Sequence, residues 1–487
     1  MLEYAEKDIS SMSNDMRLGK LTAQSLTEYY LRRIELYDKQ GPCLNSIIAV
    51  NPHALEDACV LDGERKAGKV RSVLHGIPVV VKDNMNTGDM PTTAGSAALQ
   101  RSRPAKDAFL VEKLRQAGAI ILAKTNLTEF ARHGVTVGSL VGQTCNPYDL
   151  LRTPGGSSGG TGAAVAANMA AAGLGTDTVN SIRSPSSANS LVGFRPTTGL
   201  LSRGGIIPCS CTQDTGGPIT KTVSDAVIIL DACAGYDPED PKTAESLGRK
   251  RGSYLPYLNA QGVRGKRIGL ILNNFGCHPE ILRIMKRAED VLRDLGAELI
   301  PLDIPEFETV LMNQTCDLQL FETKSCLNIY FQSVPDCPVK DIDELIGSGR
   351  LHASIVEDMN RCAHIENPLQ QPEYFKRLCT IAEKRSLAYQ IMAEHRLDVF
   401  LYPHQQILVE AIANQSQNGR NGILAAVLGF PAITLPGGFS EPSEHAPLGI
   451  PVGIEFMARP YDEPVLIEIA FGFEQKTRYR LPPVSTP

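Results

Sequence analysis

The residues with the clearest chemical potential in this chain lie between positions 153 and 184. A loop of glycines and serines spans Gly155 to Gly160, an alanine-rich apolar segment follows from Ala163 to Leu174, and a second turn of glycine and hydroxyl residues runs from Gly175 to Ser181. Alanine and glycine let backbones approach closely, while serine and threonine supply hydroxyl groups. Such a stretch suits a site where peptide N–H groups and small hydroxyls meet a reacting carbonyl group.

A second reactive side chain, Lys82, follows the apolar run Val79–Val81, which is typical of a strand covered on both faces. Two interpretations of this lysine are open from the residues alone. Either it ends the strand and reaches solvent, or it is desolvated, in which case its pKa falls and the amine can act as a general base.

Two other chemistries find less support in the sequence. The 153–184 stretch holds no histidine, and the nearest one upstream is His133, so we expect a base other than histidine. A phosphate-binding loop is disfavoured, because Gly162 is followed by two alanines where such a loop requires Lys and then Ser or Thr.

The elements that must position these residues alternate between strands and helices. Short apolar runs predict strands at 47–50, 79–81, 119–123, 267–272, 297–302, 398–401, 431–435 and 451–457. Helical periodicity and capping residues predict helices at 22–38, 54–67, 107–118, from 124 to 130, at 223–234, 279–295, from 422 to 428 and at 463–475, with mostly helical structure over 305–395. This alternation implies a sheet with crossover helices.

Several separate motifs together resemble the amidase signature family of serine hydrolases. In chain order they are Val81-Lys82-Asp83-Asn84, Gly155-Gly156-Ser157-Ser158-Gly159-Gly160, Gly175-Thr176-Asp177 leading to Ser181-Ile182-Arg183, and Gly217-Pro218 with Thr222-Val223 and Asp225-Ala226. The similarity runs from about residue 8 to about residue 475 and is weakest between 305 and 395.

The resemblance implies a Ser-Ser-Lys triad in which Ser181 is the nucleophile, Ser157 relays the proton and Lys82 is the base. It also implies a cis peptide bond between Gly156 and Ser157, a bond that is costly away from proline. The family's oxyanion hole consists of backbone N–H groups, which correspond here to Thr178, Val179, Asn180 and Ser181.

Further residues around the triad are expected to support it. We expect Ser158 either to hydrogen bond near Ser157 or to serve only as a turn residue, and Asp177 and Arg183 to form a buried pair that braces the nucleophile loop. Asp214 and Glu129 are expected to be structural. In the family, two glycines usually precede the nucleophile, whereas this chain has Val179 and Asn180, whose side chains would narrow or reshape the acyl site.

The fold implied by the resemblance is an α/β fold with a large mixed sheet sandwiched between helices. We expect one amidase signature domain over residues 1–487. Within it we expect an N-terminal helical segment at 1–70, a catalytic core at 71–235, and a variable, mostly helical substrate-side region at 305–395.

The function implied by the resemblance is hydrolysis of a linear carboxylic acid amide C–N bond without a metal or cofactor. Ester or carbamate hydrolysis could follow from the same triad. Two alternatives stay open: a component of an amidotransferase that releases ammonia from glutamine and works with partner subunits, and a non-catalytic scaffold with an amidase fold.

Composition and charge narrow the class of protein. Hydrophobic residues make up 43% of the 487 residues and the net charge is -6, with no basic stripe that would suggest a nucleic acid partner. No apolar run approaches the roughly 20 residues of a membrane helix, and the first nine residues carry four charges, so we expect neither a membrane span nor a secretory signal.

The twelve cysteines are scattered from Cys43 to Cys379 without zinc-ligand spacing, and Cys209 and Cys211 form the closest pair. We therefore expect buried free thiols and a cytoplasmic protein rather than disulfides. The expected partner is a small-molecule amide, and the oligomeric state is open, a homodimer included.

Overall fold

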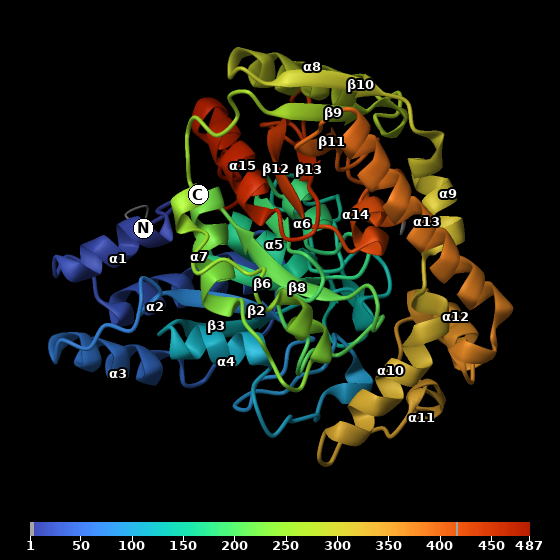
Figure 1. Cartoon of the computed structure of the whole chain (residues 1–487). Coiled ribbons are helices and arrows are strands. Elements are labelled where there is room, and N and C mark those ends of the chain that lie inside the picture. The colour runs from blue at the N-terminus through green and yellow to red at the C-terminus, as the bar shows by residue number, and fades with distance from the viewer. Residues whose placement is uncertain (1–3, 415–416) are drawn as a thin grey trace.

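One mixed sheet of 11 strands runs through the computed structural model, which describes residues 4–414 and 417–487 (Figure 1). Residues 1–3, which belong to the segment considered above for a signal, lie outside the described residues. The strand order is β1-β3-β2-β6-β8-β7-β12-β13-β11-β9-β10, and β4 and β5 form a separate hairpin.

Eight of the thirteen described strands follow the predicted apolar runs of the sequence. The bounds of all thirteen are β1 Ile47–Val50, β2 Pro78–Lys82, β3 Ile120–Thr125, β4 Val137–Gly138, β5 Gly142–Gln143, β6 Ala172–Asp177, β7 Val192–Arg195, β8 Thr215–Thr220, β9 Arg267–Ile271, β10 Glu298–Leu302, β11 Val399–Pro403, β12 Ala432–Phe439 and β13 Pro451–Met457. The eight predicted strands are all present, with boundaries shifted by a few residues.

The α-helices connect and cover these strands. Their bounds are α1 Ile9–Arg17, α2 Ala23–Arg33, α3 Ala54–Lys66, α4 Phe109–Gln116, α5 Gly159–Ala166, α6 Arg183–Ala188, α7 Val223–Cys233, α8 Pro279–Asp294, α9 Thr309–Cys316, α10 Gln319–Ser333, α11 Ile342–Gly347, α12 Ala353–Ala363, α13 Pro372–Glu394, α14 Ile423–Leu428 and α15 Glu463–Thr477. Thr22 caps α2 in a reciprocal box with Ser25.

The centre of the sheet brings the reactive segments to one place. Strand β2 lies between β3 and β6 and runs parallel to both, with Val81 opposite Leu174. The carboxyl ends of parallel strands meet at one edge of a sheet, where ligands bind in open α/β folds. The last residue of β2, Lys82, therefore lies beside the end of β6 and the start of the loop that follows it.

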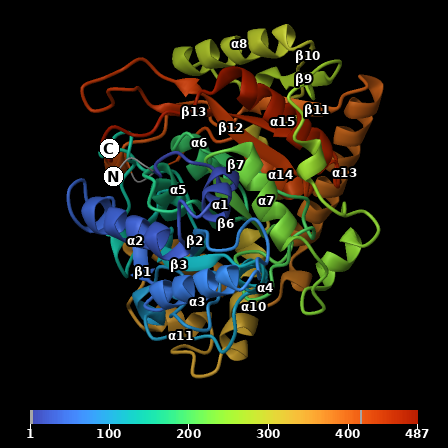
Figure 2. The same cartoon turned by 90° about the vertical axis from the view of Figure 1, so that its left-hand side faces the viewer.

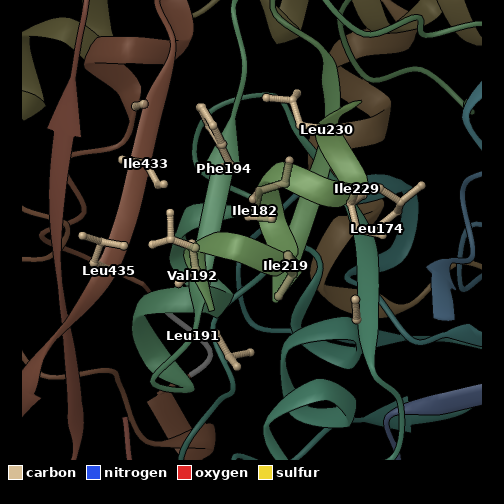
Figure 3. Close-up of a cluster of buried hydrophobic side chains, with 14 of the residues drawn as sticks. Leu174, Ile182, Leu191, Val192, Phe194, Ile219, Ile229, Leu230, Ile433 and Leu435 are labelled. Atoms are coloured by element: carbon tan, nitrogen blue, oxygen red, sulfur yellow. The ribbon is translucent and has the colours of Figure 1, made fainter. Parts of the chain in front are cut away.

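The central strands enclose a large apolar core (Figure 3). In that view, side chains of β6, β7, β8 and β12 gather with those of α7, including Leu174, Phe194, Ile219, Leu230 and Ile433. Helices α5 and α6 contact each other and the central strands, and so do α7 and α15. The predicted α/β fold with a large mixed sheet and helices is confirmed.

The periphery is arranged along the sheet. Helices α2 and α3 lie near β1 and β3 and α1 lies beside α7, whereas α8 lies with β9 and β10 at the opposite edge (Figures 1 and 2). Helices α9 to α13, which we call the helical flank, confirm the helical prediction for 305–395. A second apolar cluster joins this flank to the core, with Phe130 and Leu99 packed beside Leu327, Phe331 and Met359.

The predicted helix at 124–130 is wrong. Strand β3 continues to Thr125, and only a short 3-10 turn, Glu129–Ala131, follows. The backbone of this segment is used elsewhere: the N–H of Asn126 donates to Ser46 O (2.7 Å) and that of Thr128 to Ser157 O (3.0 Å). The segment thus forms hydrogen bonds with neighbouring loops instead of forming a helix.

All twelve cysteines lie in the described part of the chain, and each is a free thiol. Five of them are exposed, among them Cys211, so the expectation of buried thiols holds for only some of them. Among the described helices, none combines the length and apolar composition that crossing a membrane requires.

Candidate active site

Lys82 ends β2 in a fully buried position. Its Nζ donates to Ser157 Oγ (2.8 Å) and to Thr176 Oγ1 (2.7 Å). Burial lowers the pKa of Lys82 to about 7, although the carboxylates of Asp177 and Asp214 act in the opposite direction. A large fraction of this amine is therefore neutral near neutral pH and can accept a proton.

Ser157 lies in the glycine loop that precedes α5. The peptide bond between Gly156 and Ser157 is cis, as the resemblance implied, and the Ser157 side chain is fully buried. The N–H of the next residue, Ser158, donates to Ser181 O (3.2 Å), so the glycine loop lies beside residues 178–182, which carry the predicted nucleophile and which we call the nucleophile loop.

The small residues of α5 permit this close packing. All eight residues of the helix, Gly159–Ala166, are buried. A Cβ added to Gly160 would lie 2.3 Å from Asn126 O, far inside van der Waals contact. The alanines and glycines of this stretch thus allow neighbouring backbones to approach closely, as the composition of the stretch indicated.

The nucleophile loop leaves β6 after Asp177 and enters α6 at Arg183. None of the four backbone N–H groups at 178–181 donates a hydrogen bond to a described residue. Buried peptide groups are ordinarily paired, so four consecutive unused donors indicate a place for an acceptor from outside the chain. Ser181 keeps 6% of its surface exposed and lines a cleft.

A buried network of charges holds this loop. Asp177 accepts from Arg183 (3.0 Å) and from Arg195 (2.9 Å), and it also accepts the N–H of Ile182 (3.0 Å). Although burial acts to raise it, the pKa of Asp177 is lowered overall by the two guanidinium groups. Arg183 also donates to Val179 O (2.8 Å) and pairs with Glu455. The expected pair is present, within a larger network.

The two residues that replace glycines do not strain the backbone. The left-handed region favours glycine, but neither Val179 nor Asn180 is among the residues with positive φ. Val179 packs partly against the main core, and Asn180 accepts a hydrogen bond from Arg420 Nη1 at its Oδ1 (3.0 Å). Both line the cleft.

A cleft with a volume of about 480 Å³ opens in front of Ser181. The nucleophile loop forms one wall, the segment from Ala131 to Val135 another, and helix α9 with the following turn a third. The lining side chains also include Asn313, Gln314, Asp317, Gln319, Gln417, Asn418 and Arg420. This polar lining suits a polar substrate.

Ser158 does not hydrogen bond to Ser157. Its Oγ donates to Thr176 O (3.2 Å) and accepts from Thr176 N (3.3 Å), so it contacts the residue that in turn holds Lys82. Asp214 accepts from Thr178 Oγ1 (2.5 Å), and Glu129 accepts from Ser139 N (3.1 Å), both within the framework around the site.

Sequence reasoning missed three polar residues of the site. Thr176 and Asn84 belong to the recognised motifs, but only the structure shows that Thr176 Oγ1 accepts from both Lys82 and Asn84 Nδ2 (3.0 Å). Arg420 lies in no motif, and no sequence signal connects it to Asn180, which is 240 residues earlier.

No group of three or more His, Cys, Asp and Glu side chains suited to a metal ion occurs among the described residues. The chemistry that this geometry can perform is proton transfer between an uncharged amine and hydroxyl groups, next to backbone donors for a developing oxyanion.

Comparison with known proteins places this chain in a family. The family model described as Amidase matches residues 25–467, so the chain belongs to the amidase family. A probable amidase of Arabidopsis thaliana is 35% identical over 99% of this chain and 91% of its own length.

Two further relatives are an amidotransferase subunit and a peptide amidase. A glutamyl-tRNA(Gln) amidotransferase component, the A subunit of Caldanaerobacter subterraneus, is 33% identical over 99% of both chains. The crystal structure of native peptide amidase from Stenotrophomonas maltophilia superimposes with a TM-score of 0.91, at 38% identity and over 100% of both chains. The division of this chain into segments at 1–70, 71–235 and 305–395 stays a prediction, as do the catalytic roles.

Proposed function

We propose that the protein is an amidase that hydrolyses the C–N bond of a linear carboxylic acid amide through an acyl-enzyme on Ser181. Lys82 is the base and Ser157 relays the proton. The observation that carries this proposal is the buried amine of Lys82, with a pKa near 7, at 2.8 Å from the Ser157 hydroxyl.

The proposed reaction balances with the side chains of the protein, the amide substrate and one water molecule. Ser181 Oγ attacks the carbonyl carbon while its proton passes to Ser157 and the proton of Ser157 passes to neutral Lys82. The N–H groups of 178–181 bind the oxyanion. As the C–N bond breaks, the proton returns through Ser157 to the leaving amine, and water then hydrolyses the ester by the same relay.

Two amidases among the relatives support this assignment, the probable plant enzyme and the bacterial peptide amidase. We propose a small-molecule amide as substrate, with esters or carbamates as side substrates, and a cytoplasmic location. The oligomeric state is open between a monomer and a homodimer, which sedimentation of the purified chain would decide.

Covalent labelling with a fluorophosphonate tests the proposal directly. The wild-type protein should label at Ser181, and Ser181→Ala should not label. Lys82→Ala should lose both labelling and amide hydrolysis near neutral pH, whereas Lys221→Met, which also removes a buried lysine but outside the cleft, should retain both. Absence of labelling in folded wild-type protein would favour the non-catalytic scaffold, and retained hydrolysis in Lys82→Ala would refute the assigned base.

The amidotransferase relatives favour a second candidate, a component that hydrolyses glutamine together with partner chains. The two functions differ in what the purified chain does alone. A stand-alone amidase should turn over simple aryl, fatty-acyl or amino-acid amides, whereas an isolated amidotransferase component should show little glutaminase activity until its partners are added.

A further inference from the structure

The side chain of Arg420 carries a positive charge that no carboxylate within the described residues neutralises. Its Nη1 donates to Asn180 Oδ1 (3.0 Å), to Ser184 Oγ (3.3 Å) and to Gly156 O (3.5 Å), and its Nε donates to Gln417 O (3.2 Å). All four acceptors are neutral. Burial lowers the pKa of Arg420 to about 9, which reflects a cation without a counter-ion.

The other charged groups of the cleft have partners of their own. Arg132 forms an ion pair with Asp358 (2.5 Å), and burial lowers the pKa of His133, which is therefore mostly neutral at neutral pH. The Asp317 carboxylate accepts from Gln319 Nε2 (3.1 and 3.0 Å), burial raises its pKa, and it forms no ion pair with Arg420. Among the titratable groups that line the described cleft, Arg420 is thus the cation left for a ligand.

Asn180 adds a second donor beside this cation. A guanidinium group has only donors, so the amide must present its oxygen to Arg420, and its Nδ2 is the free end. Neither Asn180 Nδ2 nor Arg420 Nη2 has a hydrogen-bond partner among the described residues, and neither is among the buried unpartnered atoms, so both are open to the cleft.

Gly134 fixes the position of the guanidinium. A Cβ on this residue would lie 2.0 Å from Arg420 Nη1 and 2.4 Å from Nη2, so the guanidinium occupies the space that a side chain at position 134 would need. The two donors are therefore part of a built surface rather than the end of a freely moving side chain. Asn180 directly precedes Ser181, so their Cα atoms lie about 3.8 Å apart and this surface borders the proposed nucleophile.

We propose that Arg420 and Asn180 form a subsite for a carboxylate on the acyl side of the substrate, so that the protein prefers monoamides of short dicarboxylic acids. A carboxylate supplies two acceptor oxygens for the two free donors and the counter-ion that the buried cation lacks. This inference rests on the proposed amidase function, and it gives a role to Asn180, which occupies a position that is usually glycine in the family.

Ligand binding to the Ser181→Ala variant tests the subsite without requiring turnover. Isothermal titration would compare glutaramate with pentanamide, which lacks the carboxylate, and with the methyl ester of glutaramate, which keeps the acceptors but not the charge. We expect glutaramate to bind at least about tenfold more tightly than either neutral compound. Equal affinity for the three compounds, or no binding of glutaramate, would overturn the proposal.

The variants separate this role from a structural one. Added to Ser181→Ala, Arg420→Gln should abolish the preference for glutaramate, Asn180→Gly should weaken it, and Arg293→Gln on the exposed face of α8 should leave it unchanged. In the active enzyme, Arg420→Gln should raise KM for glutaramate at least about tenfold more than it raises KM for pentanamide, so the ratio of the two KM values is the readout. An equal loss for both substrates would assign Arg420 to loop support. If the wild-type protein binds glutaramate as expected but hydrolyses no amide, the amidase function fails and the subsite stands.

Discussion

At the scale of single residues, the position of Lys82 decides what the site can do. An exposed lysine is protonated at neutral pH and cannot act as a base. Burial at the end of β2 removes water from the amine, and two hydroxyl groups replace that water. A lysine in the same motif could not act as a base at neutral pH if its amine faced solvent.

The pH dependence of hydrolysis should therefore follow the titration of Lys82. Its folded-state pKa is about 7, and the neutral form is the active one, so kcat/KM for a neutral amide should rise with pH up to about 7 and then level. His133→Gln should leave this midpoint in place, because His133 lies outside the proton relay. A profile that is flat between pH 6 and 8 in the wild-type protein would contradict this prediction.

Thr176 should act as a positioning residue for the same amine. Thr176→Val removes an acceptor at 2.7 Å from Lys82 Nζ, which should lower kcat about tenfold and change KM little. Because the acceptor favours the charged amine, its loss should also move the pH midpoint downwards. Thr176→Ser, which keeps the hydroxyl, should retain both properties; a wild-type pH profile in Thr176→Val would exclude this role.

At the scale of elements, the glycine loop and α5 depend on backbone contact. Glycines that look alike in the sequence differ in this respect. Gly160 in α5 faces Asn126 O at a distance that excludes a Cβ, whereas a Cβ added to Gly63 in α3 would have no neighbouring atom within 4 Å.

This difference predicts opposite effects of one substitution. Gly160→Ala overpacks a buried contact and should destabilise the protein by about 1–3 kcal/mol, with loss of activity, since the displaced segment carries Ser157. Gly63→Ala should stabilise it by about 0.5–1 kcal/mol, because alanine is the better helix former. Thermal unfolding of the two variants measures both, and a stabilised Gly160→Ala would refute the packing argument.

At the scale of the whole molecule, the helical flank joins the core through its own apolar cluster. Phe331 of α10 meets Phe130 edge to face with ring centroids 6.4 Å apart, and Phe130 precedes the segment that lines the cleft. The proposed catalytic groups, in contrast, lie on β2 and the loops beside α5 and β6. One wall of the cleft and the proposed catalytic groups thus belong to different apolar clusters.

Phe331→Ala should therefore affect binding more than chemistry. Loss of this buried ring should cost about 3–5 kcal/mol of local stability and raise KM more than it lowers kcat. Hydrogen exchange should increase in α10 to α12 and stay low in β2 and β6. Ile329→Ala is the control, because Ile329 is 70% exposed on the same helix. This variant should change neither KM nor hydrogen exchange. Faster exchange in β2 would show that flank and core unfold as one unit.

The sequence predicted the elements that depend on local side chains and failed where an element depends on contacts with distant segments. Apolar runs predicted β2, its neighbour β3 and the late strands, because burial of a strand depends on its own side chains. The prediction failed at 124–130, where the hydrogen-bond partners of the backbone come from Ser46 and Ser157, which no local pattern reveals.

The sequence by itself determined the family motifs, the eight strands that follow predicted apolar runs, most of the longer helices, and the residue types of the proposed triad. Only the tertiary structure decided that Lys82 is buried, that Ser158 hydrogen bonds to Thr176, and that Arg420 hydrogen bonds to Asn180, which lies 240 residues earlier in the chain. The physical reason is that a pKa and a ligand subsite depend on which groups surround an atom in space, and neighbours in space are set by the packing of distant segments.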